Sequence, residues 1–483
     1  MEKTAIKNII KSFLESKLFI AVIGLLTVIS WQSGVMYLSY ILFTALLGLV
    51  YAFKANGVSF ISLYILLIGG SSVQSYDVKG TTHITQIVLI IVAVIPSTFF
   101  VAKDLITNRK EYFCKLKNDG IIRCMLLLTA AMLLTFITTE HYGSTAVYIL
   151  KYSLNIWFAL MVITKVDISD RAQIDNIMFS VGIMVLTIGV EAGLRLIYMK
   201  NHLDSMRNAN MGGYKIVSYP SLWKALKSKQ LGLYWAVSNH WIMITNVGLI
   251  MMIYYMVSTK KIWLKVFAGC TIAIAIILAI LTRCRGGLFG LAISMVILGY
   301  VVICRLNPSK ARMFIKLIYV GSAVAFVAIF AHKIGDKAFE EEIFDGILDP
   351  NGRNIIYAGG IKVFSDNWLL GTGAGTSKYS IMEILGKNKI MLINYHNCFI
   401  QIAATCGIIG IVSFLVYILG CLLRVYKRNM LLASFVGITF VCSFVHGQFD
   451  TFFPSSESMV VLTILLCLIP RRQLIKIVKN EEL

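Results

Sequence analysis

The sequence predicts an all-α integral membrane protein, a polytopic bundle of about 12 to 14 transmembrane helices with a long extracytoplasmic loop. Of the 483 residues, 58% are hydrophobic and only 14% are charged, which is more apolar surface than one soluble core can hide. Apolar runs of membrane-spanning length recur along nearly the whole chain, separated by short charged or glycine-containing breaks. Lysine and arginine are concentrated in alternate breaks, as in membrane proteins of fixed orientation.

The predicted spans begin close to the N-terminus, where a basic leader precedes the first apolar run. No small-residue cleavage site follows that run, so we expect a retained first helix rather than a signal peptide. In chain order, the predicted spans cover residues 10–30, 34–53, 57–73, 84–102, 121–139, 143–164, 177–199, 239–258, 262–281, 286–304, 313–331, 397–423, 430–447 and 455–470.

The breaks between spans predict the orientation in the membrane. One set is rich in Lys and Arg: residues 103–119, 165–171, 258–263, 305–312, 424–429 and the tail after 470. The opposite breaks, such as 31–34, 138–144 and 446–454, carry almost no basic residues. The positive-inside rule therefore predicts that both termini lie on the cytoplasmic side of the membrane. These loops also explain the net charge of +21, so we expect the lipid bilayer, and no nucleic acid, as a partner.

Two long outer segments divide the chain into three parts. Residues 1–331 form transmembrane helices with an outer amphipathic segment at 200–238, residues 332–396 form a large extracytoplasmic loop, and residues 397–483 form C-terminal spans and a basic cytoplasmic tail. In the first segment one apolar side is predicted to form an interfacial helix; its members are Leu222, Trp223, Leu226, Leu233 and Trp235. Apolar stretches in the second segment predict that it folds into short helices.

Specific motifs appear within and just before the second outer segment. Residues 281–287 read LTRCRGG, residues 351–353 read NGR, residues 367–373 read NWLLGTG, and His396-Asn397 precedes GIIG at 407–410. This order resembles the O-antigen ligase and polymerase superfamily of bacterial membrane glycosyltransferases. Members of that family show Thr-x-Ser-Arg-Gly, an Arg-initiated segment leading to Pro-Leu-Leu-Gly-x-Gly, and then His-Asn with Gly-x-x-Gly. The resemblance covers roughly residues 275–420, and Cys284 stands where the family has serine.

The resemblance implies a helical fold similar to GT-C-type glycosyltransferases and a lipid-to-sugar transfer reaction. The donor would be an oligosaccharide linked to polyprenyl (undecaprenyl) diphosphate, and the acceptor a hydroxyl of a lipid-linked or core glycan. A chain-length regulator is a candidate further partner. Within the family, a polymerase joins repeat units and a ligase moves a finished chain to a lipid A core or another terminal acceptor. We favour polymerase because polymerases occur in organisms with and without an outer membrane.

Arginines are the candidates for binding the diphosphate, since a guanidinium is always charged and binds phosphate oxygens bidentately. Arg285 lies at the outer mouth of an apolar helix, where a cation without a role is costly. Arg353 begins the second motif in the outer loop. Arg195 lies one helical turn from Glu191, and an ion pair between the two is as good an interpretation as a diphosphate contact.

His396 is the candidate general base, because imidazole titrates near neutral pH and can take the proton of the acceptor hydroxyl. A capping or interfacial role is the alternative for a histidine at the start of a helix. We expect Asn394 or Asn397 to cap that helix and Tyr395 to be an interfacial aromatic. Further residues that could line the site are Arg283, Asn239, His240, Tyr395 and Asn397.

A metal or cofactor is not expected. The outer acidic cluster lacks Asp-x-Asp spacing and a nearby His pair, and its residues are Asp336, Glu340, Glu341, Glu342, Asp345 and Asp349. A solvated acidic face is the better interpretation, so we expect a metal-independent enzyme. Another class, a flippase for lipid-linked oligosaccharides, fits the number of spans, but the two halves of the chain differ in their loops where transporters show paired repeats. His446, Gln448 and Asp450 in the last outer turn carry only a weak signal, and we interpret them as a simple polar turn.

Overall fold

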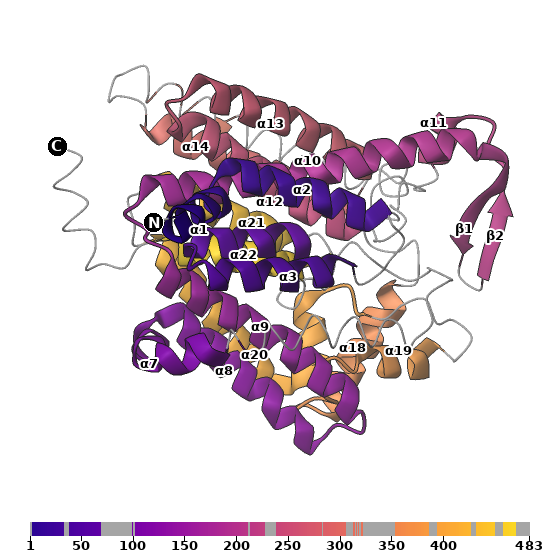
Figure 1. Ribbon diagram of the computed structural model, residues 1–483. Coiled ribbons are helices and arrows are strands. Elements are labelled where there is room, and N and C mark those ends of the chain that lie inside the picture. The colour runs from indigo at the N-terminus through magenta and orange to yellow at the C-terminus, as the bar shows by residue number, and fades with distance from the viewer. Residues whose placement is uncertain are drawn as a thin grey trace.

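The chain folds into a bundle of packed helices in a computed structural model (Figure 1). The structure describes residues 2–32, 38–68, 99, 102–210, 213–227, 238–282, 284–305, 313, 315, 317, 320–321, 353–385, 394–426, 431–449 and 457–469. Its elements are α1 Glu2–Leu14, α2 Lys17–Gln32, α3 Leu38–Ala52, α4 Gly57–Leu63, the π-helix η1 Tyr64–Ile68, α7 Arg109–Asn118, α8 Gly120–Leu134, η2 Thr135–Ile137, α9 Tyr142–Lys165, α10 Arg171–Asn201, η3 Leu203–Ser205, β1 Met206–Asn210, β2 Gly213–Val217, α11 Leu222–Lys227, α12 Ser238–Ser258, α13 Ile262–Thr282, α14 Arg285–Arg305, α18 Arg353–Asp366, α19 Ser377–Leu385, α20 Cys398–Tyr426, α21 Leu431–His446 and α22 Glu457–Cys467.

Helices of membrane-spanning length dominate the bundle. Among the described residues, 6 helices are long and apolar enough to cross a membrane, or 7 if the bent pair α1 and α2 is one span. The pair bends by 63°. Shorter apolar helices occupy the predicted spans at 34–53, 57–73, 286–304 and 430–447. The predicted spans 84–102 and 313–331 lie almost wholly outside the described residues, and the others each coincide with a helix.

Segments predicted to lie on opposite sides of the membrane lie at opposite ends of the bundle. Figure 1 shows α1 and α7 at one end and the β1–β2 hairpin, α11, α18 and α19 at the other. The sequence of α7 belongs to the Lys/Arg-rich break at 103–119, whereas the hairpin and α18 belong to the two long segments predicted outside.

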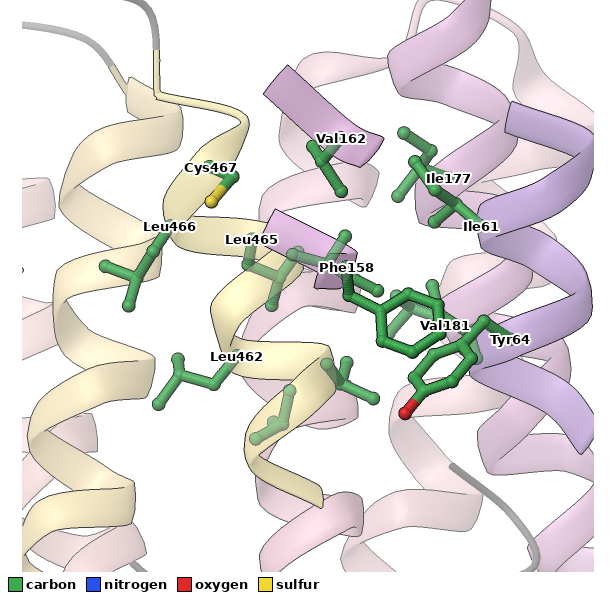
Figure 2. Close-up of a cluster of buried hydrophobic side chains, with 14 of the residues drawn as sticks. Ile61, Tyr64, Phe158, Val162, Ile177, Val181, Leu462, Leu465, Leu466 and Cys467 are labelled. Carbon is green, nitrogen blue, oxygen red and sulfur yellow. The ribbon is translucent and has the colours of Figure 1, made fainter. Parts of the chain in front are cut away.

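The core joins the two ends of the chain. Figure 2 shows side chains of η1 and α4, α9, α10 and α22 meeting in one buried cluster. Phe158 of α9 is 1% exposed and stacks on Phe60 of α4 with ring centroids 5.6 Å apart. Leu462 and Leu465 of α22 are fully buried against the same group. Because lipid is as apolar as leucine, close van der Waals packing rather than escape from water holds such helices together.

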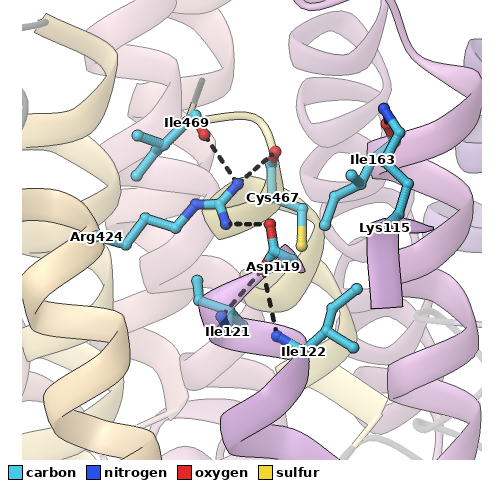
Figure 3. Close-up of polar contacts among 8 residues, drawn as sticks. All are labelled: Lys115, Asp119, Ile121, Ile122, Ile163, Arg424, Cys467 and Ile469. Carbon is cyan, nitrogen blue, oxygen red and sulfur yellow. Dashed lines mark hydrogen bonds and ion pairs between the residues drawn. The ribbon is translucent and has the colours of Figure 1, made fainter. Parts of the chain in front are cut away.

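A buried ion pair fastens α8, α20 and α22 (Figure 3). Asp119 caps α8 by accepting hydrogen bonds from the backbone N–H groups of Ile121 and Ile122 at 3.0 and 3.3 Å. Arg424, in the last turn of α20, donates to the Asp119 carboxylate at 2.8 Å. The same guanidinium donates to the carbonyls of Cys467 and Ile469 at the end of α22. These carbonyls have no hydrogen-bond donor within α22, because no further helical turn follows them.

The outer segment at 200–238 differs from the prediction. Met206–Asn210 and Gly213–Val217 pair as antiparallel strands, with Asn210 opposite Gly213, and these are the only strands among the described residues. The predicted interfacial helix is described only as the six-residue α11, in which Trp223 is 65% exposed. Leu233 and Trp235 lie outside the described residues. The hairpin was missed although the sequence Asn210-Met211-Gly212-Gly213 carries residues typical of tight turns.

Candidate functional site

The helix α14 begins at Arg285, as the sequence predicts for the arginine at the mouth of a span. Cys284 immediately precedes it and accepts the first helical hydrogen bond from the N–H of Leu288 at 2.9 Å. The backbone of Arg285 therefore belongs to the N-terminal turn, where unpaired N–H groups and the helix dipole favour anions. Arg283 lies outside the described residues.

Glycines at the start of α14 let two neighbours approach its backbone. A methyl group on Gly286 would lie 2.7 Å from the Cβ of Phe449, and one on Gly290 would lie 2.8 Å from the carbonyl oxygen of Cys442. Asn246 of α12 donates to the carbonyl of Gly287 at 2.9 Å. The elements that approach α14 most closely at these glycines are thus α12, α21 and the residues that follow α21.

Asn239 and His240 lie in the first turn of α12, the next helix to contact this region. Ile242, two residues on, is fully buried, and a methyl group on Gly287 would lie 2.4 Å from its Cγ2. The structure therefore brings the start of α12 beside the start of α14. A role for Asn239 and His240 in the site stays a prediction.

His396 occupies the junction between the outer loop and α20. Its φ of 52° is left-handed, a region that histidine adopts more readily than most residues but that still strains the backbone. Tyr357 of α18 donates from its hydroxyl to the His396 carbonyl at 3.2 Å. The N–H of Tyr395 donates to the side chain of Gln401 at 3.1 Å. Neighbours on both sides thus fix this strained junction.

Asn397 caps α20, which confirms one of the two predicted caps. Its Oδ1 accepts from the N–H groups of Phe399 and Ile400 at 2.9 and 3.1 Å. Its Nδ2 donates to the carbonyl of Gln448 at 3.1 Å. The N–H of Cys398 donates to the carbonyl of Gly447 at 2.9 Å. The cap therefore also ties α20 to the turn that follows α21.

That turn, His446–Phe449, contacts both motif-bearing helices. Besides its bonds to Asn397 and Cys398, it covers Gly286 with Phe449. His446 is 2% exposed, and its Nε2 lies 3.7 Å from the Sγ of Cys284. The interpretation of His446 and Gln448 as a simple polar turn was therefore incomplete. The only signal in the sequence was a histidine at the end of an apolar span.

The glycine-rich segment after α18 docks on a break in α20. Gly407 has φ 63° and ψ −162°, which interrupts the helix. The N–H groups of Thr372 and Gly373 donate to the carbonyls of Ala404 and Thr405 at 3.1 and 3.0 Å. In return, the N–H freed after the break, that of Ile408, donates to the carbonyl of Trp368 at 2.8 Å. The residue that opens the GIIG motif, Gly407, therefore receives a loop.

Tyr395 packs inside this region and not at an interface, so that prediction was wrong. It is fully buried among Ile356 of α18, Ile381 of α19 and Ala404 of α20. A methyl group on Gly360 would lie 2.8 Å from its ring. Burial raises the pKa of Tyr395 to about 12, so its phenol stays protonated at neutral pH.

Arg353 begins α18, the helix that holds His396 through Tyr357. Since Tyr357 lies four residues on, the start of α18 is one helical turn from that contact. The backbone positions of Arg353 and His396 are thus on neighbouring segments. Direct participation of Arg353 stays a prediction.

Arg195 lies near the end of α10, over the ring of Tyr198 at 5.2 Å. Glu191 is buried and accepts a hydrogen bond of 2.6 Å from Gln32. Leu281, at the end of α13, packs in a small cluster with Leu196 and Met199. This end of α10 therefore lies close to the segment that leads into α14, and a diphosphate contact by Arg195 stays a prediction.

Residues 270–415 match a family model described as O-antigen ligase. This part of the chain, about a third of its length, is similar to that family. The match confirms the predicted resemblance to the O-antigen ligase and polymerase superfamily and identifies a multi-pass membrane protein. No curated protein matches the chain.

The matched range includes α14, α18 and the first part of α20, and so Arg285, Arg353 and His396. The His446–Phe449 turn lies outside the matched range but contacts it at two places. Among the described residues, no group of three or more His, Cys, Asp and Glu could hold a metal ion. The predicted acidic cluster at 336–349 lies outside those residues.

Proposed function

We propose that this protein is a polysaccharide polymerase. It would transfer a glycan from polyprenyl diphosphate to an acceptor sugar hydroxyl at the outer face of the bacterial cytoplasmic membrane, with both termini cytoplasmic. The product would serve O-antigen, capsule or exopolysaccharide synthesis. The observation that carries the proposal is that one turn, His446–Phe449, contacts both the start of α14, which Arg285 opens, and the start of α20, which follows the strained His396.

The reaction needs one bond made and one broken at the anomeric carbon of the donor. The acceptor oxygen attacks that carbon, and its proton passes to His396. The bond from the anomeric carbon to the diphosphate oxygen breaks, and the electron pair leaves with the polyprenyl diphosphate. The imidazolium then returns its proton to solvent or to the departing diphosphate.

The departing diphosphate gains negative charge, and the start of α14 would stabilise that charge. The N-terminal turn of α14 offers backbone N–H groups and the positive end of a helix dipole. The guanidinium groups of Arg285 and Arg353, and in a third position Arg195, would supply charge without the need for a metal. Because such groups are already oriented before the charge develops, they stabilise the transition state without reorganising.

A second candidate is an O-antigen ligase that moves a finished glycan to a lipid A core or another terminal acceptor. The description of the matched family favours it. The chemistry at the donor is identical in the two reactions, and only the acceptor and the number of turnovers on one chain differ.

Incubation of the purified protein with a lipid-linked repeat unit separates the candidates. A ladder of products on a gel supports polymerisation. A single addition, seen only when a lipid A core acceptor is supplied, supports ligation and overturns the polymerase. Movement of the lipid across a vesicle membrane without any new glycosidic bond overturns both and supports a flippase.

A further inference from the structure

We propose that the His446–Phe449 turn holds the general base in register with the anion-binding end of α14, with Asn397 and His446 as positioning residues. The inference rests on the proposed function, since it assigns a role within the same transfer reaction. It goes beyond the matched domain, because the turn lies after residue 415.

On the α20 side, the turn provides contacts that a helix cap does not need. The Oδ1 of Asn397 alone satisfies the N–H groups of Phe399 and Ile400. Its Nδ2 is directed to the Gln448 carbonyl, and the neighbouring Cys398 N–H to the Gly447 carbonyl. These two bonds follow His396 directly in the sequence, so they limit where its backbone can go.

On the α14 side, the same turn meets the residues that flank Arg285. Cys284, just before it, lies 3.7 Å from His446 Nε2, and Gly286, just after it, lies under Phe449. Side chains larger than hydrogen at residue 286 would push the turn away. The turn is therefore a rigid spacer between the two helix starts.

A spacer of this kind matters because His396 holds a left-handed backbone conformation that a free segment would leave. The Tyr357 hydroxyl fixes the His396 carbonyl from one side, and the turn fixes the two following residues from the other. Release of one side would let the imidazole move relative to α14. A misplacement of about 1 Å can cost about 100-fold in rate.

Asn397→Ser tests the role of the turn, because serine caps a helix about as well as asparagine but cannot reach the Gln448 carbonyl. Full-length protein in detergent is assayed with a lipid-linked repeat unit. We expect kcat to fall about 10- to 100-fold with the donor KM and the melting temperature little changed. The matched control is Asn56→Ser, which changes the cap of α4 in the same way and should leave the rate unaltered.

A double-variant experiment separates positioning from general structural damage. In a His396→Gly background, Asn397→Ser should cause no further loss, because no imidazole is left to position. Equal losses in both backgrounds would overturn the inference. If Asn397→Ser does not fold, His446→Leu and His446→Gln repeat the test. The glutamine keeps a polar group towards Cys284 and should retain more activity than the leucine, and wild-type rates in both would contradict the proposal.

Failure of this inference can be distinguished from failure of the proposed function. A wild-type protein that makes no new glycosidic bond removes the proposed function. An active wild-type protein that needs His396, combined with a normal kcat for Asn397→Ser and both His446 variants, removes this inference alone.

Discussion

Replacement of His396 by glycine should abolish most of the transferase activity while leaving the fold intact. The residue has φ 52°, a conformation that glycine adopts at no cost and that other residues avoid. A non-glycine residue in the left-handed region costs about 1–3 kcal/mol. His396→Gly should therefore unfold at the same temperature as wild type or a higher one, whereas His396→Ala keeps the strain.

The loss of rate follows from the chemistry that the imidazole supplies. General acid–base help is typically worth about 10²- to 10⁴-fold, so we expect a decrease of that size in kcat. Stability and activity should thus move in opposite directions in the glycine variant. If the only role of His396 were to end the loop, the glycine variant would keep its activity.

The assay is the initial rate of repeat-unit transfer in detergent, with the melting temperature measured on the same preparation. Free imidazole should restore part of the rate in His396→Gly, since the missing side chain leaves space for it, but not in wild type. Near-normal turnover of the glycine variant would refute the assignment of His396 as the general base.

Three further predictions concern the loop, the ion pair and metals. Gly407→Ala should undock the loop and remove activity, because the left-handed φ costs a non-glycine residue about 1–2 kcal/mol and the methyl group would lie 2.3 Å from the Leu369 carbonyl oxygen. The control is Gly269→Ala on α13, where the added methyl group meets open space. The prediction is contradicted if the two variants have equal melting temperatures and equal transfer rates. Arg424→Met should destabilise the protein by about 3–5 kcal/mol, because it leaves the buried Asp119 carboxylate without its cationic partner. Adding Asp119→Asn to that variant should recover part of the lost stability, measured by thermal unfolding. A double variant no more stable than Arg424→Met would argue against the ion pair. EDTA should not change the transfer rate, and a loss that Mg²⁺ restores would show that a metal takes part.

The helical bundle was predictable because hydropathy and charge act locally along the chain. A helix of about 20 apolar residues satisfies its own backbone in lipid, so its place can be recognised without knowledge of any neighbour. The Lys/Arg-rich break at 103–119 likewise predicted which end of the bundle holds α7. The β1–β2 pair was missed because each strand has only five residues, and only the Asn-Met-Gly-Gly sequence between them was a signal.

The candidate site was predictable only in part, because motifs identify residues but not the contacts between them. Arg285 at a helix start follows from an apolar run beginning beside it. The burial of Tyr395 does not, since it depends on α18 and α19 folding back over the start of α20. The His446–Phe449 turn lies more than a hundred residues from Cys284 in the sequence, and no local pattern predicts the contact between them.

Gly371 and Gly407, the glycines of two separate motifs, lie against each other's backbone segments. A methyl group on Gly371 would lie 2.3 Å from the carbonyl carbon of Thr405, and one on Gly407 would lie 2.3 Å from the carbonyl oxygen of Leu369. Each glycine thus makes room for the backbone around the other, and either alone would look like an ordinary packing or turn residue. Together they fix the segment after α18 on α20, at a point about two turns below His396. The histidine is therefore held between two anchors of α20, the docked loop on one side and the His446–Phe449 turn on the other, and the first of these depends on backbone contacts that substitutions at Gly371 or Gly407 would break.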